Sequence, residues 1–161
     1  MARRTGPHRL NIWMNGIPVG YWESSRQGDR LGYFEEWLAD EQARPLSISL
    51  PFLPGNAVYH GPLVADFFDN LLPDNDAIRR RLAVRHQAGG IDAFHLLSKL
   101  GRDCAGAIQL LPEGESPTGV FEIDGEPLTT SDVAQRLRNI TALPALGQHG
   151  HDADLRLSIA G

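Results

Sequence analysis

The dipeptide Asn15-Gly16 lies between two runs in which every second residue is apolar, and this feature constrains the fold most. The apolar residues are Leu10, Ile12 and Met14 before the dipeptide, and Ile17, Val19 and Tyr21 after it. Because Asn and Gly tolerate positive φ, the pattern predicts a tight hairpin of two antiparallel strands. A turn at residues 26–29 and a third strand at residues 30–34 extend the hairpin to a meander, since such short turns cannot join parallel strands.

The segment after the meander carries two shorter signals. Residues 35–42 predict a short helix that ends before the Arg44-Pro45 step, because the residue ahead of a proline disfavours helical backbone. Residues 45–51, PLSISLP, alternate Leu and Ile with Ser. This alternation predicts a strand, and the proline at each end places it at a sheet edge or limits its length.

Three helices are predicted next, because apolar residues recur there at helical spacing. The first ends at Pro73, the second begins at a cap supplied by Asp74 or Asn75, and the third runs from Asp92 to Gly101. Asn and Asp favour a helix N-terminus because their side-chain oxygens accept hydrogen bonds from the first free backbone N–H groups.

Further strand patterns cover residues 105–111, 120–123 and 155–159, and Ser131 predicts the N-cap of a last helix that ends near Asn139. The resulting order is meander, helices, strands, helix and strand. It predicts an α+β fold, a small antiparallel sheet packed with several helices, and argues against a doubly wound parallel sheet.

Charge, hydropathy and cysteine content argue against several classes of function. The net charge of −5 argues against direct binding to DNA or other nucleic acids, whose phosphates attract basic surfaces. No apolar run approaches the roughly 20 residues of a membrane span. The basic start MARRTGPHRL also lacks the apolar stretch of a secretory signal. The one cysteine, Cys104, cannot form an internal disulfide, which fits a reducing compartment. Together with the hydropathy, this leads us to expect a cytoplasmic protein that does not bind membranes.

Two pairs of side chains have the spacing of a candidate site. His149 and His151 could bind one metal ion, but two histidines without a third ligand favour a solvated loop. Asp66 and Asp69 lie about one helical turn apart and could act as a carboxylate pair. Because they flank the apolar face of a helix, a solvated surface is the better interpretation.

Other candidates rest on single signals. Arg102 could activate the Cys104 thiol, although the small neighbours favour a buried, unreactive side chain. The run Arg79–Arg81 could contact phosphates, but the acidic residues ahead of it are typical of a solvated helix. The last strand pattern leads into Ala160-Gly161, where small residues allow backbone N–H groups to approach a phosphate.

Several longer motifs occur in one order between Leu10 and Gly161. They are WMNGIPVG, RPLSISLP, FFDNLLPDN, DAFHLLSKLGRD with AGAIQLLPE, and RLSIAG. In these motifs the chain resembles the N-terminal region of HipA-family toxins, the kinase half of bacterial type II toxin–antitoxin pairs. FFDNLLPD and LGRDCAGA are the most distinctive, because they are longer than chance patterning would produce.

The resemblance implies a fold and a role. Residues 1–8 would be a disordered lead-in, residues 9–140 a HipA-like N-terminal subdomain, and residues 141–161 a linker and the first strand of a truncated kinase nucleotide-binding lobe. Family members resemble serine/threonine protein kinases that use ATP and Mg. They act on translation-related proteins, typically an aminoacyl-tRNA synthetase, and a small helix-turn-helix antitoxin, HipB-like, holds them inactive.

The resemblance also assigns roles near the C-terminus. Ser158 matches the serine whose autophosphorylation expels the ATP loop, and Ala160 and Gly161 match the opening of that loop. The lysine and aspartates of the kinase site have no counterpart in this chain, so we expect no catalytic or metal residue here and no activity alone. We expect the N-terminal fragment of such a kinase; the alternative is a free-standing regulatory subunit that restrains a separate kinase chain.

Overall fold

The computed structural model describes residues 8–105, 107–120, 127–142 and 157–158. The chain divides into two compact units, Met1–Pro117 with Arg156–Gly161, and Thr118–Leu155. The predicted boundary at residue 140 between a subdomain and a linker stays a prediction.

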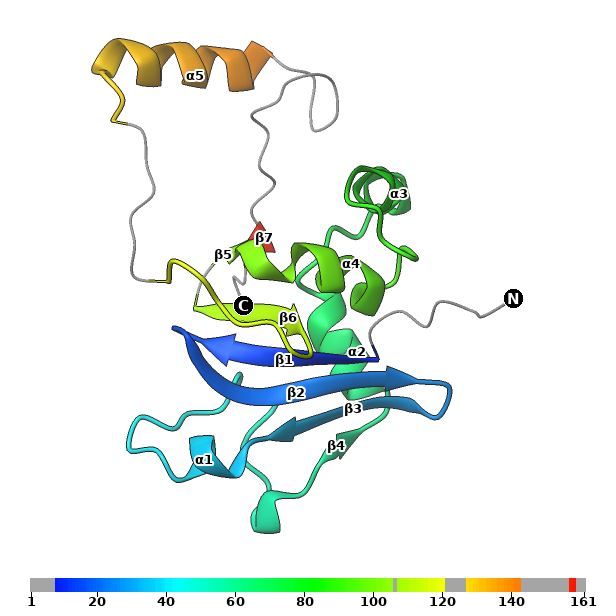
Figure 1. The fold of residues 1–161 in the computed structure, drawn as a ribbon. Coiled ribbons are helices and arrows are strands. Elements are labelled where there is room, and N and C mark those ends of the chain that lie inside the picture. Colours follow the sequence, from blue (N-terminus) through cyan, green and yellow to red (C-terminus); the bar gives the residue numbers. More distant parts are fainter. Residues whose placement is uncertain (1–7, 106, 121–126, 143–156, 159–161) are drawn as a thin grey trace. The chain divides into compact units, whose positions relative to one another are not determined.

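The first unit is built on a five-stranded antiparallel sheet (Figure 1). In the order in which they lie side by side, its strands are β4 (Tyr59–His60), β3 (Gly28–Tyr33), β2 (Ile17–Ser25), β1 (Arg9–Met14) and β6 (Ile108–Pro112). Asn15 and Gly16 form the β1–β2 turn with φ of 49° and 80°. The predicted hairpin, meander and α+β class are therefore confirmed.

A bulge in β2 changes which side chains face the core. The register shifts between Ile12, which pairs with Gly20, and Trp13, which pairs with Pro18. Val19 is therefore the extra residue, and the inward face of β2 changes phase there. Val19 and Trp22 are buried, whereas Ile17 is 37% exposed. Ile17, Val19 and Tyr21, which alternate in the sequence, therefore do not share one buried face of the strand.

Residues 45–51 form turns and irregular backbone, so the predicted strand is wrong. The Tyr33 hydroxyl holds this segment, because it donates to the Leu50 carbonyl and accepts from the Leu46 N–H at 3.0 Å. Burial raises the pKa of Tyr33 to about 12. The helix before it, α1 (Glu35–Leu38), also ends earlier than predicted, and the Trp37 indole donates to the Arg44 carbonyl at 3.1 Å. The segment is thus shaped by buried aromatic residues rather than by pairing with a neighbouring strand.

The three predicted helices are confirmed as α2 (Pro62–Asp69), α3 (Asp76–Arg85) and α4 (Ala93–Leu100). A 3₁₀ turn, η1 (Pro54–Asn56), precedes β4, and another, η2 (Gly101–Asp103), follows α4. Asn75 caps α3 by accepting from the Ala77 and Ile78 N–H groups, and Asp92 caps α4 by accepting from the His95 N–H at 3.1 Å. Both caps lie where the sequence places them.

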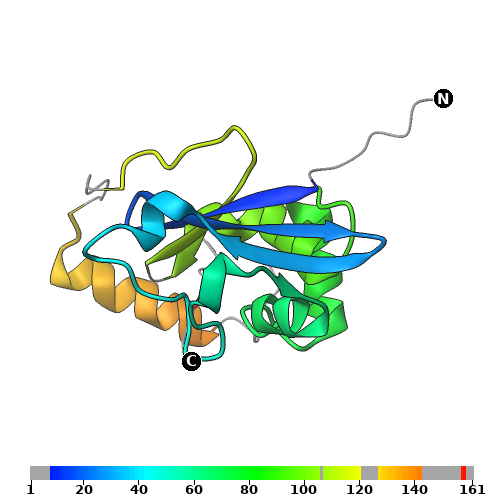
Figure 2. The same ribbon diagram turned by 90° about the horizontal axis from the view of Figure 1, so that it is seen from below.

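The hydrophobic core lies where α2 and α4 pack against the sheet (Figure 2). Trp22 from β2 stacks on Phe68 from α2, with ring centroids 4.2 Å apart, and meets the edge of Phe94 from α4 at 4.8 Å. Fully burying side chains of this size stabilises the fold by roughly 1.5–3 kcal/mol each. This aromatic cluster fixes the two helices to the sheet.

The expected strand at residues 105–111 is two strands, β5 (Cys104–Ala105) and β6. The backbone of β5 pairs in parallel with β7 (Leu157–Ser158), which joins Cys104 to Leu157 and Ala105 to Ser158. The RLSIAG motif therefore contributes a strand to the same unit as the LGRDCAGA motif.

The second unit contains α5 (Thr130–Ala142). Its N-cap is Thr129 rather than the predicted Ser131. The Thr129 hydroxyl accepts from the Asp132 N–H, and the Asp132 carboxylate accepts from the Thr129 N–H at 2.9 Å, which is a capping box. The Thr129 hydroxyl also donates to the Asp132 carboxylate at 2.6 Å. This hydrogen bond, together with the one from the Thr129 N–H, lowers the pKa of Asp132. Of the strand predicted at residues 120–123, Val120 lies in a turn and the rest lies outside the described residues.

Among the described residues, no helix combines the length and the apolar content that crossing a membrane requires.

Candidate functional site

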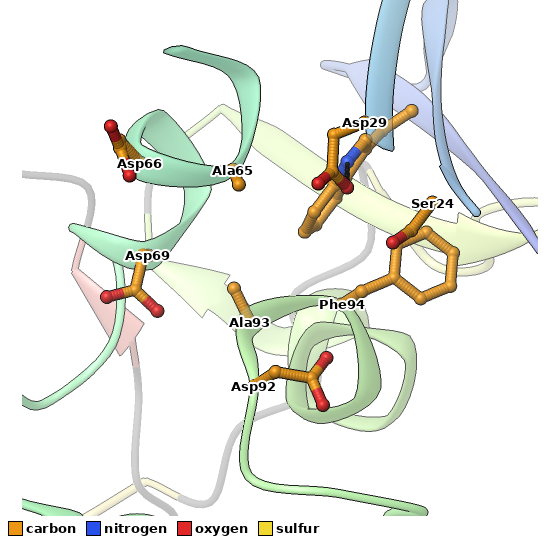
Figure 3. Close-up of a pocket in the computed structure, with 9 residues that line it drawn as sticks. Ser24, Asp29, Ala65, Asp66, Asp69, Asp92, Ala93 and Phe94 are labelled. Carbon is orange, nitrogen blue, oxygen red and sulfur yellow. Dashed lines mark hydrogen bonds between the residues drawn. The ribbon is translucent and has the colours of Figure 1, made fainter. Parts of the chain in front are cut away.

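A shallow acidic pocket of about 340 Å³ opens beside the core (Figure 3). It is lined by Trp22, Ser24, Asp29, Ala65, Asp66, Asp69, Asp92, Ala93 and Phe94. The lining comes from β2, β3, α2 and the start of α4. The pocket brings Asp66 and Asp69, the carboxylate pair noted in the sequence, together with Asp29 and Asp92, which the sequence did not indicate as part of a site.

Three of these four carboxylates already bind protein groups. Asp29 accepts from the Trp22 indole at 2.9 Å, and Asp69 binds Arg79. Asp92 caps α4, and its Oδ2 lies 2.7 Å from His95 Nδ1. No set of three or more His, Cys, Asp or Glu within the described ranges is placed to hold a metal ion. Asp29, Asp69 and Asp92 are therefore engaged in contacts that stabilise the fold.

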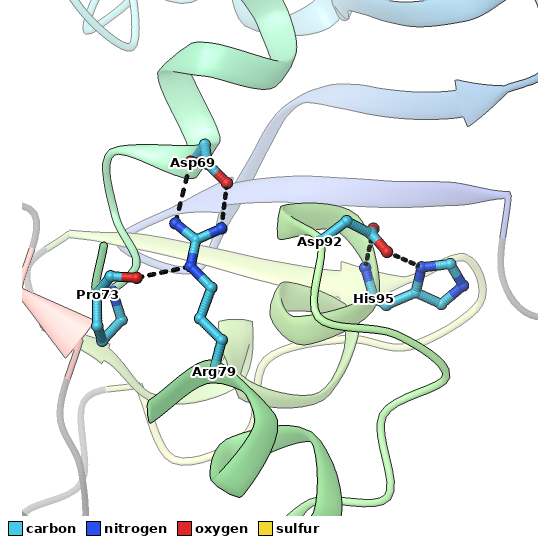
Figure 4. Close-up of polar contacts among 5 residues, drawn as sticks. All are labelled: Asp69, Pro73, Arg79, Asp92 and His95. Carbon is cyan, nitrogen blue, oxygen red and sulfur yellow. Dashed lines mark hydrogen bonds and ion pairs between the residues drawn. The ribbon is translucent and has the colours of Figure 1, made fainter. Parts of the chain in front are cut away.

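Arg79 forms a clamp across the turn between α2 and α3 (Figure 4). Its two terminal nitrogens donate to the two Asp69 oxygens at 2.7 and 3.0 Å, and its Nε donates to the Pro73 carbonyl at 2.6 Å. The residue is buried, and the hydrogen bond to Asp69 raises the pKa of Arg79. The predicted solvated helix face is therefore wrong for Arg79. The Asp69 side chain is 46% exposed, as a solvated surface predicts, and it also binds Arg79.

Five of the nine residues of the FFDNLLPDN motif make contacts within the fold. Phe68 belongs to the aromatic cluster, Leu72 is buried, and Asn75 caps α3. Asp69 and Pro73 are the two acceptors of the Arg79 clamp. These residues stabilise the packing of α2, the α2–α3 turn and the start of α3, and none of these contacts requires a ligand.

The LGRD motif closes the other end of α4 in a similar way. A Cβ on Gly101 would lie 2.6 Å from the Leu110 carbonyl oxygen, so only glycine allows this close approach to β6. The Arg102 guanidinium forms an ion pair with Glu115, and the Gln109 amide donates to the Arg102 carbonyl at 2.9 Å. The motif thus locks α4 against the sheet.

The remaining predicted site residues lie at the edge of the described structure or beyond it. Ser158 is in β7, and its backbone pairs with Ala105. Ala160, Gly161, His149 and His151 lie outside the described residues, as does the Cys104 thiol. The assignments of an ATP loop and of a regulatory serine therefore stay predictions.

The described sheet, helices and motif contacts define an α+β domain whose longest motifs stabilise the fold. Residues 10–111 match the family described as HipA N-terminal domain. The chain therefore belongs to the HipA family, and this confirms the resemblance seen in its motifs.

Two relatives come from Sinorhizobium fredii. The protein named "Putative kinase Y4mE" is 37% identical over 155 residues, which cover 94% of this chain and 36% of that protein. The protein named "Putative kinase Y4dM" is 34% identical over 117 residues, covering 66% of this chain and 27% of that protein. The chain thus spans about a third of the curated relatives it matches.

A solved structure has the same fold. HipA in the complex of Shewanella oneidensis HipA, HipB and operator DNA is 25% identical, with a TM-score of 0.58. The match covers 94% of this chain and 33% of that one. It extends the likeness well beyond the family match at residues 10–111.

Proposed function

We propose that this chain is the N-terminal part of a HipA-type serine/threonine kinase toxin, in which it supports the kinase lobe and has no activity alone. The observation that carries the proposal is the 37% identity over nearly the whole chain to a protein that is almost three times as long. The use of FFDNLLPDN and LGRD in fold-stabilising contacts supports a structural role.

For the whole protein we propose ATP- and Mg-dependent phosphorylation of a translation-related protein, such as an aminoacyl-tRNA synthetase. The relative from Shewanella was solved with HipB and operator DNA, so we propose a HipB-like antitoxin as the partner of this family member too. DNA contact would come from that antitoxin. The net charge of −5 supports this division of roles.

We further propose Ser158 as the regulatory serine and Ala160-Gly161 as the start of the ATP loop. A phosphate on Ser158 would add nearly two negative charges beside the nucleotide phosphates, so that loop and ATP repel each other. The position of Ser158 in β7, which pairs with β5 and lies just before Ala160 in the sequence, supports the assignment.

The test separates the chain from the whole protein. Purified chain incubated with Mg-ATP should incorporate no phosphate. The Y4mE protein in which this chain replaces the matching 155 residues should phosphorylate itself, and Ser158→Ala should reduce this labelling. Phosphate incorporation by the isolated chain refutes the proposed inactivity. If the Ser158→Ala hybrid phosphorylates itself as much as the unsubstituted hybrid does, the proposed role of Ser158 is refuted. A kinase that is restrained when the chain is added separately would favour the free-standing regulatory subunit.

A further inference from the structure

The residues between Arg44 and His60 form the least charged surface segment of the first unit. They contain no Asp, Glu, Lys or Arg, although these residues make up 22% of the chain. We call residues 45–58 the uncharged loop. Apart from the short 3₁₀ turn η1, the uncharged loop has no regular secondary structure.

The uncharged loop presents apolar side chains to solvent. Ile48 is 97% exposed, and the half-buried residues of the loop include Leu46, Phe52, Leu53 and Val58. A single exposed aliphatic residue is common on a protein surface, whereas several apolar residues that reach solvent within one short segment are informative. Ile48, which lies between two serines, is the most exposed large hydrophobic residue of the loop.

The loop is held in one conformation before any partner binds. The Tyr33 hydroxyl bridges Leu46 and Leu50, and the Tyr59 hydroxyl donates to the Pro51 carbonyl at 2.6 Å. The Asn56 side chain donates to the Tyr33 carbonyl at 3.3 Å. A loop already fixed in this way loses little conformational entropy on docking, which is the usual property of an interface anchor.

We propose that the uncharged loop is the surface on which the kinase lobe packs in the whole protein, with Ile48 inserted in an apolar pocket of that lobe. This inference rests on the proposed function. The partner of this surface is inferred from the relatives: this chain spans only 36% of Y4mE and 33% of Shewanella HipA, so most of each relative lies outside the matched part. The absence of charge fits a covalently tethered partner, which needs no electrostatic steering to find the surface.

Val84 provides a matched control. It is also a large exposed aliphatic residue, at 81%, but it lies on α3 among Arg80, Arg81 and Arg85. Ile48→Asp and Val84→Asp therefore make the same change in charge at two exposed sites. In the isolated chain both variants should keep the parent's urea midpoint, which establishes that they fold.

The decisive measurement is backbone hydrogen exchange in the isolated chain and in the hybrid with Y4mE. We expect peptides of the uncharged loop to exchange at least about tenfold more slowly in the hybrid. Ile48→Asp should abolish most of this slowing, and Val84→Asp should leave it unchanged.

The other outcomes are distinct. Slowing confined to other surfaces, or slowing in the loop that survives Ile48→Asp, overturns the inference and leaves the proposed function standing. No slowing anywhere in the chain contradicts the packing of the chain on the kinase lobe itself. If exchange in the loop slows in the isolated chain as its concentration rises, the loop binds a second copy of the chain. If it slows only after Shewanella HipB is added, the loop binds the antitoxin. Either result also overturns the inference.

Discussion

Replacing Arg79 with alanine tests whether the clamp between α2 and α3 stabilises this domain. The change removes three hydrogen bonds, two to Asp69 and one to the Pro73 carbonyl, from a residue that is 9% exposed. Arg80, the next residue, offers a matched control. It pairs with Asp76 at 3.3 Å, with side chains 65% and 66% exposed.

The two substitutions should differ in free energy of unfolding because their surroundings differ. Hydrogen bonds to charged groups contribute about 1.5–3 kcal/mol each when they are buried. The Asp69 side chain is 46% exposed, so water replaces part of what it loses. We therefore expect Arg79→Ala to lower the free energy of unfolding by about 2–3 kcal/mol. An exposed i,i+4 pair contributes only about 0.3–0.5 kcal/mol, which is the loss expected for Arg80→Ala.

Urea unfolding followed by tryptophan fluorescence measures both variants. All three tryptophans lie in the first unit, so the signal reports on the unit that contains the clamp. Arg79→Lys keeps the charge but cannot donate to both Asp69 oxygens and Pro73 at once, so it should lose about 1–2 kcal/mol. A double-mutant cycle with Asp69→Ala should give a coupling energy of about 1 kcal/mol or more between the two residues.

Two results would refute this reasoning. If Arg79→Ala and Arg80→Ala lose the same free energy within about 0.5 kcal/mol, burial of the clamp does not matter. If Arg79→Lys is as stable as the parent, the charge alone is sufficient and the planar geometry of the guanidinium is not used.

Three shorter predictions concern the rest of the fold. Gly101→Ala should lower the free energy of unfolding by about 1–3 kcal/mol, because its Cβ meets the Leu110 carbonyl; an unchanged urea midpoint contradicts this. Because burial stabilises the neutral Tyr33 phenol, its contribution is complete below pH 10 and is lost as the pH rises through about 12. The urea midpoint should fall over that range, and a fall just as steep in Tyr33→Phe refutes the assignment. Asn75→Ala should lower the free energy of unfolding by about 1 kcal/mol, and Asn75→Asp should lower it much less, since Asp also caps a helix. Equal losses for the two variants in urea unfolding would contradict the cap.

Most of the local structure could be predicted from the sequence, because it depends on residues only a few positions apart. The Asn15-Gly16 turn is set by the tolerance of both residues for positive φ. The caps at Asn75 and Asp92 are set by side-chain oxygens that reach N–H groups two or three residues ahead. The motifs also predicted the family, and the family match confirms it.

The candidate site was predicted less well. Asp66 and Asp69 were found by their spacing, but the pocket also draws on Asp29 and Asp92, which are distant in sequence. No local signal shows that Arg79 turns back toward Asp69 rather than toward solvent. A buried arginine requires its acceptors in place, and the α2–α3 turn supplies them only once the chain is folded.

The sequence by itself determined the hairpin, the three central helices, the α+β class and the HipA family, since each follows from adjacent residues or from long motifs. Tertiary structure alone decided the bulge at Val19 and the path of residues 45–51. The alternation in PLSISLP favours a strand, but the Tyr33 hydroxyl, 13 and 17 residues away from its two partners, satisfies backbone groups that a strand would have paired with a neighbour. A long-range hydrogen bond to a buried side chain thus outweighs a local preference, and it does so in the segment that we propose as the docking surface.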